Sequence, residues 1–203
     1  GRGIRTVVDL RADSEVARDP SRLWSGVANF TSLPIAESAA EPVSLLDRIL
    51  SGAITSMSES QMADVYITLL ADNASQFARF ATLAADVDNW PMLYHCTAGK
   101  DRTGLATALV LELCDVGREH VLDEYCATNE QHSYRRIEEL RETLERAGVD
   151  LEAIRPLLMA PRPVLAGALA HLDDSYGGIE GFLVDAGGMG PTVPAEVRLN
   201  LVV

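Results

Sequence analysis

The strongest chemical signal in the chain is a cysteine followed, after five intervening residues, by an arginine. Cys96 stands directly after the apolar run 91–95, and Arg102 stands where a long apolar helix is expected to begin. A strand that turns tightly into a helix can point several backbone N–H groups inward, and the helix N-terminus adds unsatisfied donors and partial positive charge. Gly99 allows the turn, and Gly104 allows the helix to pack closely. The pattern predicts a binding site for a tetrahedral dianion such as a phosphate group.

The same surroundings would make the cysteine reactive. Because helix N-termini and nearby cations stabilise a thiolate, Cys96 is the candidate nucleophile for covalent phosphoryl transfer. The planar fork of Arg102 can hold two phosphoryl oxygens and tighten its grip in the transition state. Thr103 is placed to hydrogen-bond the sulfur and help it leave the phosphocysteine, while His95 is expected to orient the loop from behind. This chemistry requires no metal and no cofactor.

The complete loop is a more specific indication than its cysteine and arginine alone. Residues 95–104 read HCTAGKDRTG, which resembles the signature loop of the cysteine-dependent protein tyrosine phosphatase superfamily. The GKDRTG form is similar to that of one bacterial tyrosine/serine phosphatase branch, the mycobacterial protein tyrosine phosphatase B type. The resemblance extends to residues 3–11 and 62–66, and to residues 123–125 with Asn129. It implies an enzyme that hydrolyses phosphate monoesters, of phosphotyrosine and also of phosphoserine or phosphothreonine, through a phosphocysteine intermediate.

The leaving oxygen needs a proton from a carboxylic acid within hydrogen-bond reach. Many tyrosine phosphatases carry that acid in a Trp-Pro-Asp loop well upstream of the cysteine. Here Trp90-Pro91 is not followed by aspartate and lies inside the expected strand, so it cannot serve. The bacterial branch implies Asp101, on the rim of the loop, as the general acid. Asp9, at the end of the first expected strand, and Asp64, in an expected helix, remain the alternatives.

The substrate-binding residues are expected to be those of the loop itself: Thr97, Ala98, Gly99, Lys100 and Thr103. Lys100 has two interpretations, as a rim lysine satisfied by solvent or as a second cation for substrates with more than one phosphate. Phosphoinositide phosphatases often carry the same Ala-Gly-Lys, so phosphoinositides or inositol phosphates are the alternative substrates. Two less favoured functions are a phosphate-binding pseudophosphatase without turnover and a rhodanese-like sulfurtransferase.

The elements that must position this loop follow from the hydrophobic spacing. Residues 4–10 read as a strand and residues 27–35 as a weaker one, whereas helical spacing dominates from residue 42 onward. A capping-box pattern, Ser58-x-x-Gln61, opens one helix, and a helix that is apolar on most of its circumference follows the loop. We therefore predict an α/β fold: a central sheet flanked by helices, a phosphate-binding loop between strand and helix, and a helix-rich C-terminal half.

The chain is expected to form a single phosphatase domain over residues 1–203. Because a domain rarely begins with a core strand at residue 4, we expect further residues to precede Gly1. The charged segment 133–146 is usually a solvated helix face. The resemblance implies a second interpretation, in which residues 133–158 form a helical lid over the site.

The composition limits the partners. The chain has 30 acidic and 17 basic residues, and its net charge of −13 disfavours nucleic acid and anionic membrane surfaces. Its three cysteines form neither a disulfide framework nor a zinc pattern, and no apolar run is long enough to span a membrane. We expect a cytoplasmic protein without stable membrane insertion, with secretion that lacks a recognisable signal as the alternative. The expected partner is a phosphorylated protein or a phosphoinositide, and the sequence does not predict the oligomeric state.

Overall fold

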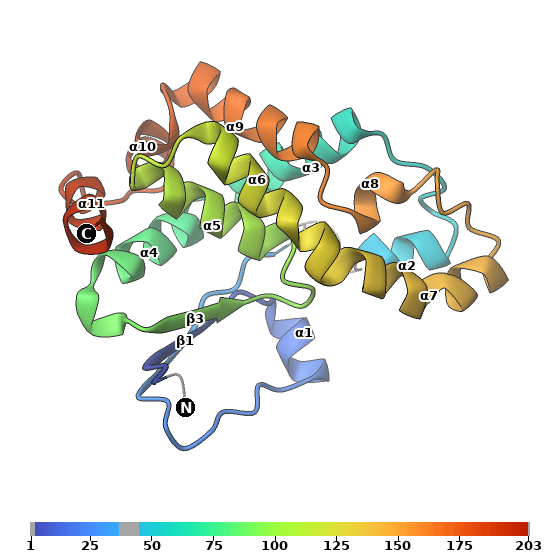
Figure 1. The fold of residues 1–203 in the computed structure, drawn as a ribbon, viewed down its shortest axis with the longest axis horizontal. Helices are drawn as coiled ribbons and strands as arrows, with labels where there is room; N and C mark the ends of the chain where they lie inside the picture. Colours follow the sequence, from blue (N-terminus) through green and yellow to red (C-terminus); the bar gives the residue numbers. More distant parts are fainter. Residues whose placement is uncertain (1–2, 37–44, 203) are drawn as a thin grey trace.

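The computed structural model describes residues 3–36 and 45–202. Three short strands form a parallel sheet in the order β2-β1-β3. Their bounds are Thr6–Asp9 for β1, Asn29–Ser32 for β2 and Met92–His95 for β3. The central strand β1 is buried along its whole length. Neighbouring parallel strands need a crossover connection. Here the chain forms several helices after β2 before it returns to the sheet as β3 (Figure 1).

Helices make up most of the remaining described chain (Figure 1). Their bounds are Asp13–Arg18 for α1, Leu45–Leu50 for α2, Glu59–Asp72 for α3, Ala74–Ala85 for α4, Asp101–Leu113 for α5, Arg118–Thr128 for α6, Tyr134–Arg146 for α7, Arg155–Leu158 for α8, Arg162–Tyr176 for α9, Ile179–Gly181 for α10 and Val193–Leu201 for α11. A short 3₁₀-helix, η1 (Val87–Asn89), precedes β3, and two short π-helices are η2 (Asn129–Ser133) and η3 (Phe182–Ala186).

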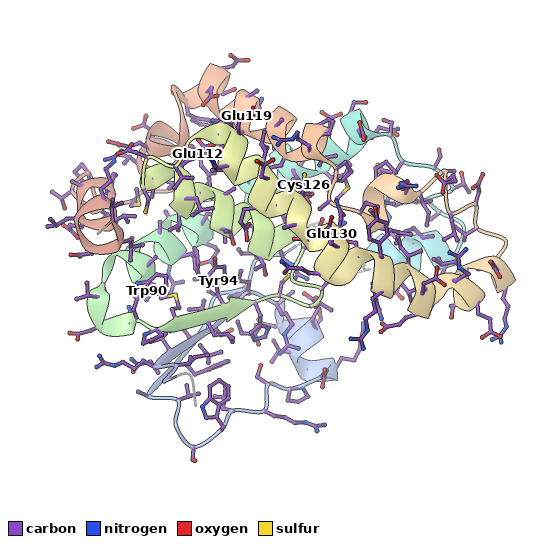
Figure 2. The ribbon with its side chains drawn as sticks, in the orientation of Figure 1. Trp90, Tyr94, Glu112, Glu119, Cys126 and Glu130 are labelled. Carbon is purple, nitrogen blue, oxygen red and sulfur yellow. The ribbon has the colours of Figure 1, made fainter. Side chains whose placement is uncertain are left out.

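One face of the sheet packs against the helices. Val8 of β1 belongs to the main core, and Tyr94 lies beside it in register on β3. The Tyr94 ring meets Phe80 of α4 edge-on, with centroids 4.8 Å apart, and its hydroxyl lies 2.8 Å from the Thr107 hydroxyl of α5. Figure 2 shows Tyr94 between β3 and these helices. This packing fixes the end of β3, from which the candidate loop starts.

The helix that follows the loop, α5, is the centre of the helical layer. Its residues Leu105, Ala106 and Leu109 are buried, as the sequence predicted. A Cβ added at Gly104 would lie 3.1 Å from the Tyr125 ring, so the glycine allows α5 and α6 to approach closely. The predicted role of this glycine is therefore confirmed.

The α/β fold predicted from the sequence is confirmed, with differences in detail. The capping box opens α3 as expected, because the Ser58 hydroxyl accepts from the Gln61 N–H while the Gln61 side chain accepts from the Ser58 N–H. The short helix α1 was not predicted. The helix after the loop, α5, ends at Leu113, and Gly117 directly precedes α6. Residue 42, from which helical spacing was predicted to dominate, lies outside the described residues.

Candidate active site

The loop between β3 and α5 has the shape that the sequence predicted. Gly99 adopts a φ of +71°, which a residue with a Cβ rarely takes, and its N–H donates to the Cys96 sulfur over 3.2 Å. Cys96 is only 7% exposed, at the base of the loop, whereas residues 97–99 are exposed. The thiol therefore lies at the bottom of a backbone turn whose rim faces solvent.

Arg102, in the first turn of α5, holds a carboxylate at this loop. Its Nη2 donates to Glu15 Oε1 over 2.8 Å, its Nη1 donates to Glu15 Oε2, and the Thr97 hydroxyl also donates to Glu15. Burial by itself would raise the pKa of Glu15, but the hydrogen bonds from Arg102 and Thr97 outweigh it and lower the pKa to about 2. The guanidinium thus grips two oxygens of an anion in the bidentate manner that suits a phosphoryl group.

Glu15 was missed by sequence reasoning. It lies on α1, where its Oε2 also accepts from the Ala12 N–H at 2.9 Å. One sequence signal was available: Glu15 stands three residues after Ala12, the residue before the helix, as the glutamate of a capping box does. Ala12 supplies no capping side chain, so the pattern was incomplete.

Asp101 is the first residue of α5, and its carboxylate is approached by two donors. The Tyr66 hydroxyl of α3 donates to Oδ1 over 2.7 Å, and Lys100 Nζ lies 3.2 Å from the same oxygen. The hydroxyl of Tyr125, on α6, lies 2.8 Å from that of Tyr66. The Asp101 side chain keeps 29% of its surface exposed. It therefore stands at the rim of the loop with one oxygen anchored from behind.

Lys100 is buried, with only 5% of its surface exposed. Its ammonium donates to the carbonyl oxygens of Leu157, in the last turn of α8, and of Met159, just after that helix, at 2.5 and 3.0 Å. This setting differs from a rim lysine satisfied by solvent. The second interpretation, contact with a second phosphate, stays a prediction, and such contact would require Lys100 to release these carbonyls.

The two alternative acids lie in different surroundings. Asp9 is fully buried, where it accepts from Arg11 Nη2 and from the Ser21 hydroxyl, both over 2.7 Å. Burial would raise the pKa of Asp9, but the hydrogen bonds from Arg11 and Ser21 lower it to about 2, which suits a permanent anion better than a proton donor. Asp64 is exposed on α3, two residues before Tyr66, and residues two apart on a helix do not share a face. Asp101 stays the favoured acid.

Comparison with known proteins decides the family. The family model described as the tyrosine phosphatase family matches residues 1–203, the whole chain. The chain belongs to the tyrosine phosphatase family. It is 29% identical over 215 residues to the triple specificity protein phosphatase PtpB of Mycobacterium tuberculosis, an alignment that covers 91% of this chain and 78% of that protein. It is also 29% identical over 190 residues to a tyrosine-protein phosphatase of Nostoc commune, covering 91% of this chain and 62% of that protein.

The predicted superfamily and enzyme class are thereby confirmed: the chain is a phosphatase that acts on phosphorylated substrates. The family places it among phosphatases rather than among sulfurtransferases. Within the described part of the chain, no helix has the length and apolar character needed to cross a membrane. No group of three or more histidine, cysteine, aspartate or glutamate side chains in the described ranges is arranged to hold a metal ion.

His95 and Thr103, at the two ends of the loop, differ in their hydrogen bonding. The Nδ1 of His95 lies 3.0 Å from the Cys96 carbonyl oxygen, and its expected role in orienting the loop stays a prediction. Thr103 was expected to bond the sulfur. Its hydroxyl is buried and has no hydrogen-bond partner within residues 3–36 and 45–202, so its role toward the sulfur stays a prediction.

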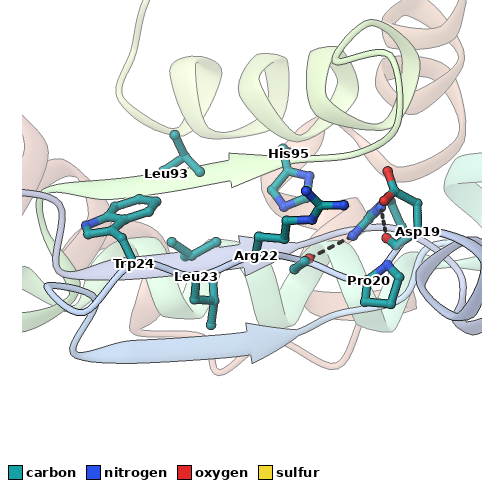
Figure 3. Close-up of a pocket in the computed structure, with 10 residues that line it drawn as sticks. Asp19, Pro20, Arg22, Leu23, Trp24, Leu93 and His95 are labelled. Carbon is teal, nitrogen blue, oxygen red and sulfur yellow. Dashed lines mark hydrogen bonds between the residues drawn. The ribbon is translucent and has the colours of Figure 1, made fainter.

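A cavity of about 460 Å³ lies on the other face of the phosphatase's sheet. Its lining includes Trp24, Leu23 and Leu93 along the strands, with Arg22 and His95 near the carboxyl end of β3 (Figure 3). Apart from His95, which precedes the loop, the lining contains no residue of the segment 95–102. This cavity is therefore distinct from the turn that surrounds the Cys96 sulfur.

Proposed function

We propose that this phosphatase hydrolyses phosphotyrosine in proteins through a phosphocysteine intermediate on Cys96. The observation that carries the proposal is the bidentate grip of Arg102 on a carboxylate beside the loop that holds the thiol. A phosphoryl group can present two oxygens to the guanidinium in the same way, and it carries more negative charge than a carboxylate. Backbone N–H groups of the loop and the N-terminus of α5 supply further donors.

The proposed reaction has two steps. In the first, the Cys96 thiolate attacks phosphorus, the bond from phosphorus to the leaving oxygen breaks, and Asp101 gives its proton to that oxygen. In the second, water attacks the phosphocysteine, the sulfur–phosphorus bond breaks, and Asp101 takes a proton from the water. Arg102 stabilises the equatorial oxygens in both steps.

The proposed order of substrates begins with phosphotyrosine. The family description supports this choice, and the name of the Mycobacterium relative, a triple specificity phosphatase, supports phosphoserine and phosphothreonine as additional substrates. Phosphoinositides are the alternative. The buried position of Lys100 speaks against them, since its ammonium already donates to two backbone carbonyls. Rates on tyrosine, serine and threonine phosphopeptides and on phosphoinositides test the order, and a preference for phosphoinositides would overturn it.

The proposed chemistry is tested with 4-nitrophenyl phosphate in the presence of a chelator. Hydrolysis is expected to continue in the chelator and to disappear in Cys96→Ser. Cys126→Ser is the matched control, because Cys126 is also a free cysteine but lies half-buried on α6. Turnover that depends on an added metal ion, or that survives in Cys96→Ser, would contradict the proposal.

A further inference from the structure

Three side chains from three helices form a line of hydrogen bonds behind the loop. Tyr125 of α6 contacts Tyr66 of α3 through their hydroxyls, 2.8 Å apart, and Tyr66 contacts Asp101 Oδ1 of α5 at 2.7 Å. Both tyrosines are buried, and their rings meet edge-on with centroids 6.3 Å apart. The proposed reaction makes no use of either hydroxyl, although each is placed by a different element.

The direction of these hydrogen bonds follows from the number of protons. A tyrosine hydroxyl has one hydrogen, so Tyr66, which donates it to Asp101, must accept the hydrogen of Tyr125. Burial, and then the charge of Asp101, raise the pKa of Tyr66 well above its usual value, and the same two causes raise the pKa of Tyr125. Both hydroxyls therefore remain protonated donors throughout the pH range of an assay.

The two oxygens of the Asp101 carboxylate are consequently not equivalent. Oδ1 is approached by the Tyr66 hydroxyl and by Lys100 Nζ. Among the described side chains, the hydrogen bond from Tyr66 and the shortest approach of Lys100 both fall on Oδ1. A carboxylic acid whose one oxygen accepts hydrogen bonds carries its proton on the other oxygen, which here is Oδ2.

We propose that Tyr66, held in place by Tyr125, is a positioning residue for the general-acid step. It keeps Oδ1 as the acceptor, so that Oδ2 faces the leaving group with the proton. As the phosphorus–oxygen bond breaks, the Oδ2 proton passes to the leaving oxygen, and the carboxylate that results is stabilised by the hydroxyl of Tyr66. This inference rests on the proposed function, in which Asp101 is the acid.

The test compares two aryl phosphates that differ in how much their leaving groups need a proton. Phenyl phosphate releases a basic phenolate, whereas 4-nitrophenyl phosphate releases a stable one. In Tyr66→Phe, kcat on phenyl phosphate is expected to fall roughly tenfold, the effect of about one hydrogen bond to a charged group. The change on 4-nitrophenyl phosphate is expected to be much smaller, and KM is expected to stay constant for both esters.

A double-mutant comparison separates positioning from general loosening. In the Asp101→Asn background, Tyr66→Phe is expected to cause no further leaving-group-dependent loss, because the acid it positions is already absent. Wild-type turnover that disappears in Cys96→Ser tests the proposed function independently. Failure of the Tyr66 prediction with that control intact would overturn only the further inference.

Tyr94→Phe is the matched control, because Tyr94 also has a hydrogen-bonded hydroxyl but contacts Thr107 rather than Asp101. It is expected to leave the ratio of the two rates unchanged. Tyr125 is one hydrogen bond further from the acid, so Tyr125→Phe is expected to lower kcat less, with the same dependence on the leaving group. If Tyr66→Phe does not fold, Tyr125→Phe is used for the test instead. Equal losses on both esters, or an undiminished effect in Asp101→Asn, would overturn the proposal.

Discussion

Arg102 binds the Glu15 carboxylate with the same fork that the proposed reaction assigns to phosphate. Glu15 is an anion at ordinary pH, since its pKa is lowered to about 2. We expect Glu15 to compete with a bound phosphoryl group for the guanidinium. Entry of phosphate would then require the carboxylate to move away from the loop.

Glu15→Gln is therefore predicted to bind inorganic phosphate more tightly. Replacing a charged acceptor by a neutral amide weakens the competing hydrogen bonds, so the inhibition constant of phosphate is expected to fall roughly tenfold. Glu196→Gln, an exposed change of the same charge on α11, is the control and is expected to change little. Weaker phosphate binding in Glu15→Gln would instead indicate that Glu15 supports Arg102.

Asp9 provides a prediction about stability and pH. Its pKa is lowered from 3.8 to about 2, so the ionised form stabilises the folded state above about pH 4, and this contribution is lost as the pH falls toward 2. Asp9→Asn is predicted to lower the free energy of unfolding at pH 7 by about 3 kcal/mol, because Arg11 keeps a buried charge without its partner. Urea unfolding between pH 7 and pH 2 measures both effects. A variant whose stability falls with acid as steeply as the wild type would contradict this account.

At the scale of elements, the turn between α8 and α9 is held from two sides. Lys100 of the loop bonds to Met159, and Asn129, directly after α6, bonds to Ala160. The Asn129 side chain, at the end of α6, donates to the Ala160 carbonyl over 2.9 Å and accepts from the Ala160 N–H over 2.7 Å. Leu144 and Ile154, within the predicted lid 133–158, are buried in the core. The lid stays a prediction, and any opening must break these contacts.

Lys100→Met is predicted to loosen this turn. It keeps the length of the side chain but removes the donors to Leu157 and Met159, so amide hydrogen exchange in residues 155–160 is expected to quicken. The expected loss of stability is about 2 kcal/mol, since two buried carbonyls lose their donor. Arg155→Met, which removes an exposed ion pair with Glu152, is the control. Unchanged exchange in Lys100→Met would refute the anchoring role.

Local signals explain which elements could be predicted. The β-branched run of β1, the Ser58 capping box and the loop around Cys96 each have a sequence pattern that acts within a few residues. The contact of Glu15 with Arg102 joins residues 87 apart, and the Lys100 contacts join the loop to carbonyls 57 and 59 residues further on. Backbone carbonyls carry no sequence signature, and α1 lacks a capping side chain. These parts of the site therefore could not be predicted.

At the scale of the whole molecule, the net charge of −13 repels the substrate that the enzyme must bind. The described basic side chains of the site are already engaged by acidic groups or carbonyls, as with Arg102 and Lys100. Affinity for a phosphate ester must therefore come from the loop amides, the α5 N-terminus and the guanidinium rather than from the overall field. The central claim is accordingly local: one thiol in this loop receives the phosphoryl group.

The most direct test of that claim is to stop the reaction in acid during turnover and find the phosphorylated peptide by mass spectrometry. We predict a phosphoryl group on the sulfur of Cys96, absent from Cys96→Ser and present in Cys126→Ser. A phosphoryl group on any other side chain, or turnover by Cys96→Ser, would contradict the account.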